Sequence, residues 1–167
     1  MRKIEAKELT LESFNVYGSY TNLINPQTPK LGTEPSEFFR DMVLLNLDSS
    51  NIAAFSICRV TKRPFVIEST EFHRNTGEGV LPLDGDILMH VGLATQNGEI
   101  PIDKIEVFRV PRGTVVTLRK GVWHNAPFAY NCDCVNILIV LPERTYANDC
   151  YVYEIPGDKR IEISGIR

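Results

Sequence analysis

The sequence predicts an all-β fold, a single jelly-roll sandwich or barrel over residues 1–167 with one short helix near the N-terminus. Three observations support this fold class. Helical periodicity is almost absent after Gly18, and short apolar or alternating runs are separated by turn residues at regular intervals. With 167 residues, of which 43% are hydrophobic and 23% charged, the chain also has the size and composition of one globular domain.

The expected helix covers residues 7–17. Thr10 offers a hydroxyl for the N-cap, Leu11 and Phe14 form an apolar side, and a glycine follows to end the helix. Farther along, residues 25–35 contain three prolines and one glycine. We expect this segment to be one long ordered loop.

The rest of the chain is expected to form mostly strands, because β-branched and aromatic residues are bounded there by turn residues. The expected strands are 41–47, 52–60, 64–69, 79–83, 86–94, 105–110, 114–118, 135–140 and 149–154. The turns between them are Asp84-Gly85, Gln96-Asn97-Gly98, Pro111-Arg112-Gly113 and Lys120-Gly121.

Charge and hydropathy exclude several classes of protein. The 18 basic and 21 acidic residues give a net charge of -3 without a block of one sign, which argues against a nucleic-acid partner. The N-terminus lacks the apolar run of a signal peptide, and the longest apolar stretches, such as 135–141, are far shorter than the roughly 20 residues that span a bilayer. We therefore expect a soluble, cytoplasmic protein with no membrane contact. Its cysteines contain no CxxC pair and are expected to be reduced: Cys58, Cys132, Cys134 and Cys150.

Two of the three histidines lie close to carboxylates or turns in positions that can converge. In Glu71-Phe72-His73 the first and third side chains point to one face of a strand. Glu78 follows five residues later, and His124 follows a separate turn that places it opposite the others in a rolled sheet. Two histidines and two carboxylates form a mixed N/O set that suits Mn²⁺, Fe²⁺, Co²⁺, Ni²⁺ or Zn²⁺. We therefore predict a divalent metal site.

The same residues resemble the motifs of a known superfamily. The spacing Glu71-x-His73-x4-Glu78 is similar to the first cupin motif, which normally opens with His-x-His, and Gly121-x2-His124 is similar to the core of the second. This resemblance implies a cupin, RmlC-like fold and assigns the metal to these four side chains. It also implies a homodimer, because cupins usually dimerise through exchanged strands.

Most of the chain is similar to the ureidoglycolate lyase family, also called the ureidoglycolate hydrolase family, a cupin group of about this length. The similarity rests on the order and spacing of short stretches: Phe14-x-x-Tyr17-Gly18, Ile57-Cys58-Arg59, Glu71-Phe72-His73, Leu81-Pro82-Leu83-x-Gly85, Val122-Trp123-His124 and Phe128-Ala129. The position of Glu78 is commonly glutamine in the family, and a carboxylate is a stronger metal ligand. The resemblance implies cleavage of ureidoglycolate to glyoxylate and urea, a step in the breakdown of allantoin and purines.

Such a cleavage needs a base at the hydroxyl and an acid at the departing nitrogen, and it needs no redox cofactor. With a metal bound, Glu71 or Glu78 would be the base. In a metal-free site, His73 and His124 would themselves be the acid and the base.

Three further residues are candidates for binding a small carboxylate substrate. Arg59 lies in an apolar strand, where a cation is costly unless an anion meets it. Lys120 precedes the turn that carries His124 and could neutralise an anion near the metal. His90, within segment 86–94, could line the pocket or serve a structural role.

Two other functions use the same fold and keep the assignment open. One is a metal-dependent cupin isomerase or dioxygenase that acts on a small hydroxy acid or a sugar. The other is a non-catalytic cupin that binds a small molecule.

Overall fold

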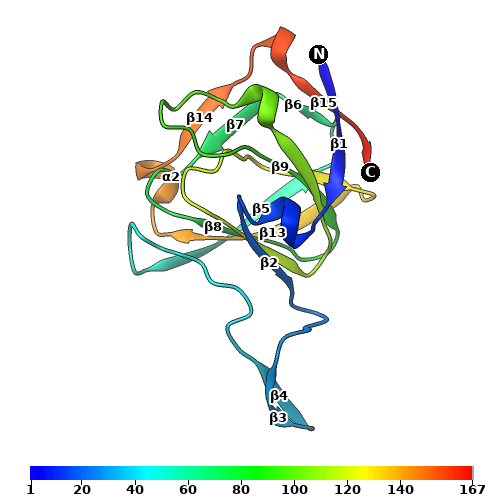
Figure 1. The fold of residues 1–167 in the computed structure, drawn as a ribbon, viewed down its shortest axis with the longest axis vertical. Coiled ribbons are helices and arrows are strands. Elements are labelled where there is room, and N and C mark those ends of the chain that lie inside the picture. Colours follow the sequence, from blue (N-terminus) through cyan, green and yellow to red (C-terminus); the bar gives the residue numbers. More distant parts are fainter. Residues whose placement is uncertain (167) are drawn as a thin grey trace.

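The computed structural model describes residues 1–166, and its regular secondary structure consists mainly of strands (Figure 1). In chain order the strands are β1 (Arg2–Glu8), β2 (Gly18–Asn22), β3 (Lys30–Thr33), β4 (Ser36–Phe39), β5 (Ala53–Thr61), β6 (Val66–Ile67), β7 (Ser69–Phe72), β8 (Glu78–Pro82), β9 (Asp86–Val91), β10 (Glu106–Val110), β11 (Thr114–Leu118), β12 (Phe128–Tyr130), β13 (Cys134–Pro142), β14 (Tyr151–Glu154) and β15 (Ile161–Ile166). The short helices are α1 (Leu11–Phe14) and α2 (Thr145–Asn148), with 3-10 turns at Ile102–Lys104 and Gly157–Lys159.

Two curled sheets form the body of the molecule. One has the strand order β12-β9-β10-β1-β15-β6, and the other has the order β2-β11-β8-β13-β5. The short pairs β14-β7 and β3-β4 complete the fold. The predicted all-β class, a sandwich of curled sheets with a short helix near the N-terminus, is confirmed.

Apolar side chains from the two sheets fill the interior. Strand β13 shows why this sequence forms a strand, because buried and partly exposed side chains alternate along it with period two. Its inward residues join one core cluster with Val80 of β8 and Met89 of β9. Those inward residues are Val135, Ile137, Ile139 and Leu141. The core thus fixes β8 and β9, which carry Glu78 and His90.

The N-terminal segment differs from the prediction. The helix expected over residues 7–17 is only Leu11–Phe14, and the first two residues of the expected helix end strand β1. The cap was predicted correctly, since Thr10 accepts a hydrogen bond from the backbone N–H of Ser13 at 3.1 Å. Residues 2–8 form a strand because residues 2–6 pair with β15 and residues 7 and 8 pair with β10.

The segment between β2 and β5 also differs. The expected loop over residues 25–35 contains β3, which pairs with β4 in a hairpin that projects from the sandwich (Figure 1). The strand expected at 41–47 is irregular chain, which enters the left-handed backbone region at Asp41 with φ of 53°. Exposed apolar side chains on the hairpin, Leu31 and Phe38, are of the kind found at protein contacts. The homodimer stays a prediction.

Other expected strands occur with shifted ends. Segment 64–69 is divided between β6 and β7, and β2, β12 and β15 were not expected. No helix among residues 1–166 is long and apolar enough to cross a membrane.

Helix α1 seals one end of the core through Phe14, which is completely buried and meets Phe108 edge to face at 5.2 Å between ring centroids. Phe14→Ala is expected to lower the free energy of unfolding by about 3–5 kcal/mol, because it removes a packed aromatic ring and leaves a cavity. Leu11→Ala on the same helix is the control, since Leu11 is 76% exposed and its loss should cost less than about 0.5 kcal/mol. Equal losses in urea denaturation would contradict this account of the core.

Candidate metal centre

The backbone brings the four predicted ligands together from three parts of the chain. Glu71 lies in β7, His73 follows that strand, and Glu78 begins β8. His124 comes from the connection between β11 and β12 and pairs with Glu71 through two backbone hydrogen bonds, of 2.6 and 2.8 Å. His124 is therefore a direct neighbour of Glu71 rather than facing it across the sheet. The positive φ of Gly121, 78°, turns the chain so that its N–H reaches the carbonyl of His73 at 2.6 Å.

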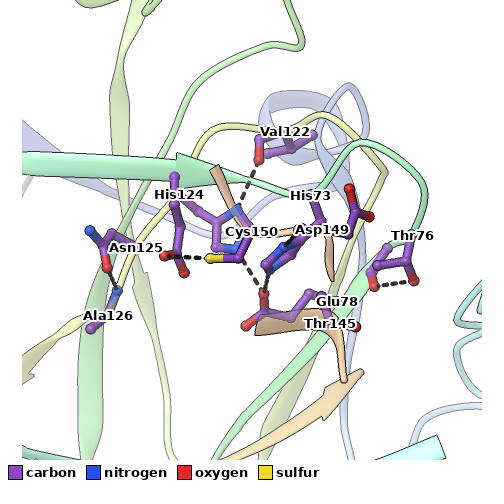
Figure 2. Close-up of polar contacts among 12 residues, drawn as sticks. His73, Thr76, Glu78, Val122, His124, Asn125, Ala126, Thr145, Asp149 and Cys150 are labelled. Atoms are coloured by element: carbon purple, nitrogen blue, oxygen red, sulfur yellow. Dashed lines mark hydrogen bonds and ion pairs between the residues drawn. The ribbon is translucent and has the colours of Figure 1, made fainter. Parts of the chain in front are cut away.

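Both imidazoles point to one carboxylate oxygen. Oε2 of Glu78 lies 2.9 Å from Nε2 of His73 and 2.7 Å from Nε2 of His124 (Figure 2). All three side chains are buried, with exposed fractions of 2% for His73, 4% for His124 and 4% for Glu78. A buried carboxylate is stable only when a positive charge or hydrogen-bond donors face it. The carboxylate of Glu78 therefore requires a protonated imidazole or a cation beside it.

The protons on the two rings follow from their outer hydrogen bonds. Nδ1 of His73 lies 2.7 Å from the carbonyl of Asp149, and Nδ1 of His124 lies 2.8 Å from the carbonyl of Val122 (Figure 2). A carbonyl can only accept, so each Nδ1 carries a hydrogen and each Nε2 is left to face Glu78. This is the orientation of metal-binding histidines, whose other nitrogen donates to a carbonyl or a carboxylate.

The charges of the three groups depend on one another. Burial raises the pKa of Glu78, but His124 and His73 outweigh this effect and lower it to about 2. Burial lowers the pKa of His124, but the charges of Glu78 and Glu71 outweigh it and raise the pKa to about 9. Without a metal, the cluster therefore holds a proton on His124 at neutral pH. A divalent ion would supply the same compensation.

Glu71 completes the cluster from its edge. Its side chain is half-buried, and Oε2 accepts a hydrogen bond from the thiol of Cys150 at 3.4 Å. Burial, together with Glu71, raises the pKa of Cys150 to about 12, which keeps the thiol protonated as a donor. Glu71 is thus held less tightly than Glu78, which is in contact with two imidazoles.

The donor set fits a divalent ion. One ligand atom each from Glu71, His73 and His124 lies within 4.8 Å of the others. Ligands of a common ion at about 2.0–2.3 Å must be close neighbours, and imidazole and carboxylate suit several first-row metals. The donors are compatible with Mn²⁺, Fe²⁺, Co²⁺, Ni²⁺ and Zn²⁺ alike.

A cavity of about 230 Å³ opens beside the cluster and is bordered by Glu71, Glu78 and His124. Pockets for drug-sized ligands measure about 300–1,000 Å³, so this one suits a smaller molecule. Tyr146 of α2 also borders it, with its ring 6.1 Å from that of His73. We define this space as the cluster cavity.

Sequence reasoning missed Tyr146 and Asp149. Besides its carbonyl bond to His73, Asp149 accepts hydrogen bonds through its carboxylate from the backbone N–H groups of Arg74 and Asn75, at 2.9 and 2.8 Å. It thereby fixes the turn between β7 and β8. These partners lie more than 70 residues away along the chain, so no local pattern marks either residue.

The structure corrects the role predicted for Arg59. Cys58 and Val60 of β5 pack against the core, so the side chain between them lies on the opposite, exposed face. Its Nε donates to Oδ1 of Asn136 on β13 at 2.9 Å. Arg59 therefore does not border the cavity beside the cluster, although it does border a second cavity next to it.

Lys120 is directed away from the cluster. It is exposed, and its Nζ pairs with Asp48 at 3.3 Å on the surface. The cluster cavity is bordered by neither Lys120 nor Arg59. The prediction that Lys120 neutralises an anion near the metal is corrected accordingly.

His90 is buried on β9 and borders a second cavity next to the cluster cavity. Its Nε2 lies 3.2 Å from the hydroxyl of Thr70. Burial lowers the pKa of His90 to about 3, with contributions from His124 and Arg63, so the ring is neutral.

Known proteins share features of sequence and structure with this chain. A family model described as Ureidoglycolate lyase matches residues 1–162. No curated protein matches the chain. Among solved structures, a dTDP sugar isomerase from Desulfovibrio desulfuricans G20 shares 12% sequence identity at a TM-score of 0.48, covering 86% of this chain and 87% of that chain.

The oxalate decarboxylase of Bacillus subtilis, a protein with Mn(II) centres, shares 17% identity at a TM-score of 0.43. The alignment covers 62% of this chain and 24% of the decarboxylase. The chain thus spans about a quarter of the length of that enzyme.

Proposed function

Because the chain belongs to the ureidoglycolate lyase family, we propose that it cleaves ureidoglycolate to glyoxylate and urea at the cluster of Glu71, His73, Glu78 and His124. The observation that supports this most is the pair of buried imidazoles whose Nε2 atoms share one carboxylate oxygen. Such a site can hold a divalent ion, and the volume of the cluster cavity suits a small molecule.

Ureidoglycolate carries a hydroxyl and a ureido nitrogen on the carbon next to its carboxylate. Loss of the hydroxyl proton lets the oxygen form the aldehyde C=O bond of glyoxylate. The C–N bond then breaks, its electron pair stays on nitrogen, and one proton on that nitrogen completes urea. The reaction moves one proton from oxygen to nitrogen and needs no oxidant.

Glu71 is the base that the geometry favours. Glu78 is held by both imidazoles, whereas Glu71 borders the cluster cavity and receives one thiol hydrogen bond. Hydroxyl and nitrogen share one carbon, so the proton accepted by Glu71 can be returned to the departing nitrogen. With Glu71 as the base, His73 and His124 together with Glu78, which faces both imidazoles, would hold the ion. A divalent ion bound there would lower the pKa of the substrate hydroxyl, as it does that of bound water.

The test is urea and glyoxylate release from ureidoglycolate by the purified protein, with its metal content measured in parallel. We expect metal-stripped protein to lose activity by about 100-fold or more, and one of Mn²⁺, Fe²⁺, Co²⁺, Ni²⁺ or Zn²⁺ to restore it.

Other outcomes identify the other functions. Oxygen uptake with a hydroxy acid would indicate a dioxygenase, and saturable binding without turnover would indicate a binding protein. Full urea release by metal-stripped protein would contradict the metal-assisted mechanism and support His73 and His124 as acid and base.

A further inference from the structure

A second cavity, of about 370 Å³, lies directly beside the cluster cavity and shares Cys58, Asn125 and Ala126 with it. Arg59 borders this cavity with its Nε bonded to Asn136, and so do Arg63 and His90, which take no part in the cluster. We define this space as the side cavity. The hydrogen-bonding state of Arg63 and His90 indicates what it can bind.

Arg63 is held in place with part of its donor capacity free. Its Nη2 donates to the carbonyls of Ala126 and Pro127 at 2.8 and 3.2 Å, and its guanidinium lies over the ring of Phe128 at 3.9 Å. Among residues 1–166 the guanidinium makes these two hydrogen bonds and no other. Nε and Nη1 are therefore available to pair with a carboxylate. The acid on the same border, Glu68, is paired with Arg160 at 2.6 Å.

His90 presents a buried acceptor. The hydroxyl of Thr70 donates its one hydrogen to the carbonyl of His124 at 3.1 Å, so it has none left for His90. The contact between Thr70 and Nε2 of His90 must therefore use a hydrogen on Nε2. Nδ1 of this neutral ring is then a bare acceptor, and it is buried with no hydrogen-bond partner among residues 1–166. An unsatisfied buried group of this kind indicates a missing donor.

We propose that the side cavity anchors a small carboxylate that also carries an N–H or O–H group. Arg63 pairs with the carboxylate, and Nδ1 of His90 accepts the hydrogen bond. The identity of that molecule as the substrate rests on the proposed function, since ureidoglycolate carries a carboxylate and a ureido group within one small molecule. Arg63 and His90 are positioning residues, which hold the substrate while the neighbouring cluster acts on its hydroxyl.

The probe is hydantoate, which has the carboxylate and ureido group of ureidoglycolate but lacks the hydroxyl and so cannot be cleaved. Calorimetric binding to the protein as purified is compared with binding to Arg63→Gln, Arg63→Lys and the control Arg112→Gln, an exposed arginine of the β10-β11 turn. We expect Arg63→Gln to weaken binding by about 10- to 100-fold, Arg63→Lys to restore part of it, and the control to match wild type. In the urea assay, Arg63→Gln should raise KM far more than it lowers kcat.

His90→Gln keeps a donor near Thr70 and removes the acceptor at Nδ1, so it should weaken hydantoate binding by about 3- to 10-fold. Because a buried substitution can prevent folding, the same contact is tested in wild type. The ¹⁵N NMR signal of the unprotonated Nδ1 of His90 should shift when hydantoate binds.

The outcomes separate this inference from the proposed function. Arg63-dependent hydantoate binding without urea release would support the side cavity as a carboxylate site and contradict the lyase. Urea release with unchanged KM in Arg63→Gln, or an unchanged His90 signal at saturating hydantoate, would overturn the inference and leave the lyase intact.

Discussion

Glu78→Gln is expected to lower bound metal and urea release together, each by about 100-fold or more. Glutamine nearly preserves the shape of the side chain but offers a neutral carbonyl oxygen in place of the carboxylate that faces both imidazoles. The fold should survive, because His124 can lose its proton when its partner loses its charge. Elemental analysis and the urea assay on the same preparation measure the two effects.

Glu162→Gln is the matched control, since Glu162 pairs with Lys3 on the surface of β15 and lies outside the cluster. It should leave metal content and activity unchanged. Excess metal should restore part of both properties in Glu78→Gln. Normal turnover by metal-free Glu78→Gln would show that His73 and His124 do the chemistry without the ion.

The stability of the metal-free protein is expected to peak near pH 6.5. His124 has a folded pKa of about 9, above its ordinary value of 6.5, so its contribution is complete below pH 6.5 and is lost as pH rises through 9. His90 has a folded pKa of about 3, so its contribution is complete above pH 6.5 and is lost as pH falls toward 3. Each limb should slope by about 1.4 kcal/mol per pH unit, the value for one proton.

Urea denaturation between pH 4.5 and 9 measures this profile. The lowest pH of the series is 4.5, the ordinary pKa of Glu78, so that this carboxylate does not add to the acidic limb. The folded pKa of Glu78 is lowered to about 2, so its contribution to stability is present above pH 4.5 and is lost as pH falls through 2. His124→Gln should flatten the alkaline limb, and His90→Gln the acidic limb. A saturating divalent ion should also reduce the alkaline slope, because it replaces the proton on His124. A flat wild-type profile would contradict the charge states assigned to both histidines.

The sequence predicted the strand-rich fold and the convergence of the cluster because both depend on local patterns. A run of β-branched residues between turn residues placed a strand at 114–118, which are the observed bounds of β11. The Glu-x-His pair with its flanking turns indicated that the predicted ligands would meet; Glu71, His73 and His124 lie within 4.8 Å of one another, and Glu78 contacts both imidazoles. Their catalytic roles stay predictions.

The remaining features depend on contacts between distant parts of the chain. Arg59 lies within an apolar strand and Arg63 follows that strand, and only the pairing of β5 with β13 shows that Arg59 lies on the outer face. The carbonyls of Asp149 and Val122 that orient the imidazoles likewise depend on backbone geometry rather than side-chain identity. Sequence patterns carry no signal for such contacts.

The placement of β1 has a consequence for synthesis of the chain. This strand lies inside the six-stranded sheet, between β10 and β15, so its neighbours come late. Glu8 meets Arg109, which is 101 residues away, and Lys3 meets Glu162, 159 residues away. During translation, the backbone groups of β1 therefore stay unpaired until β10 and β15 have left the ribosome. Since non-local pairing is slow, we expect this sheet to close only after β15 has been synthesised.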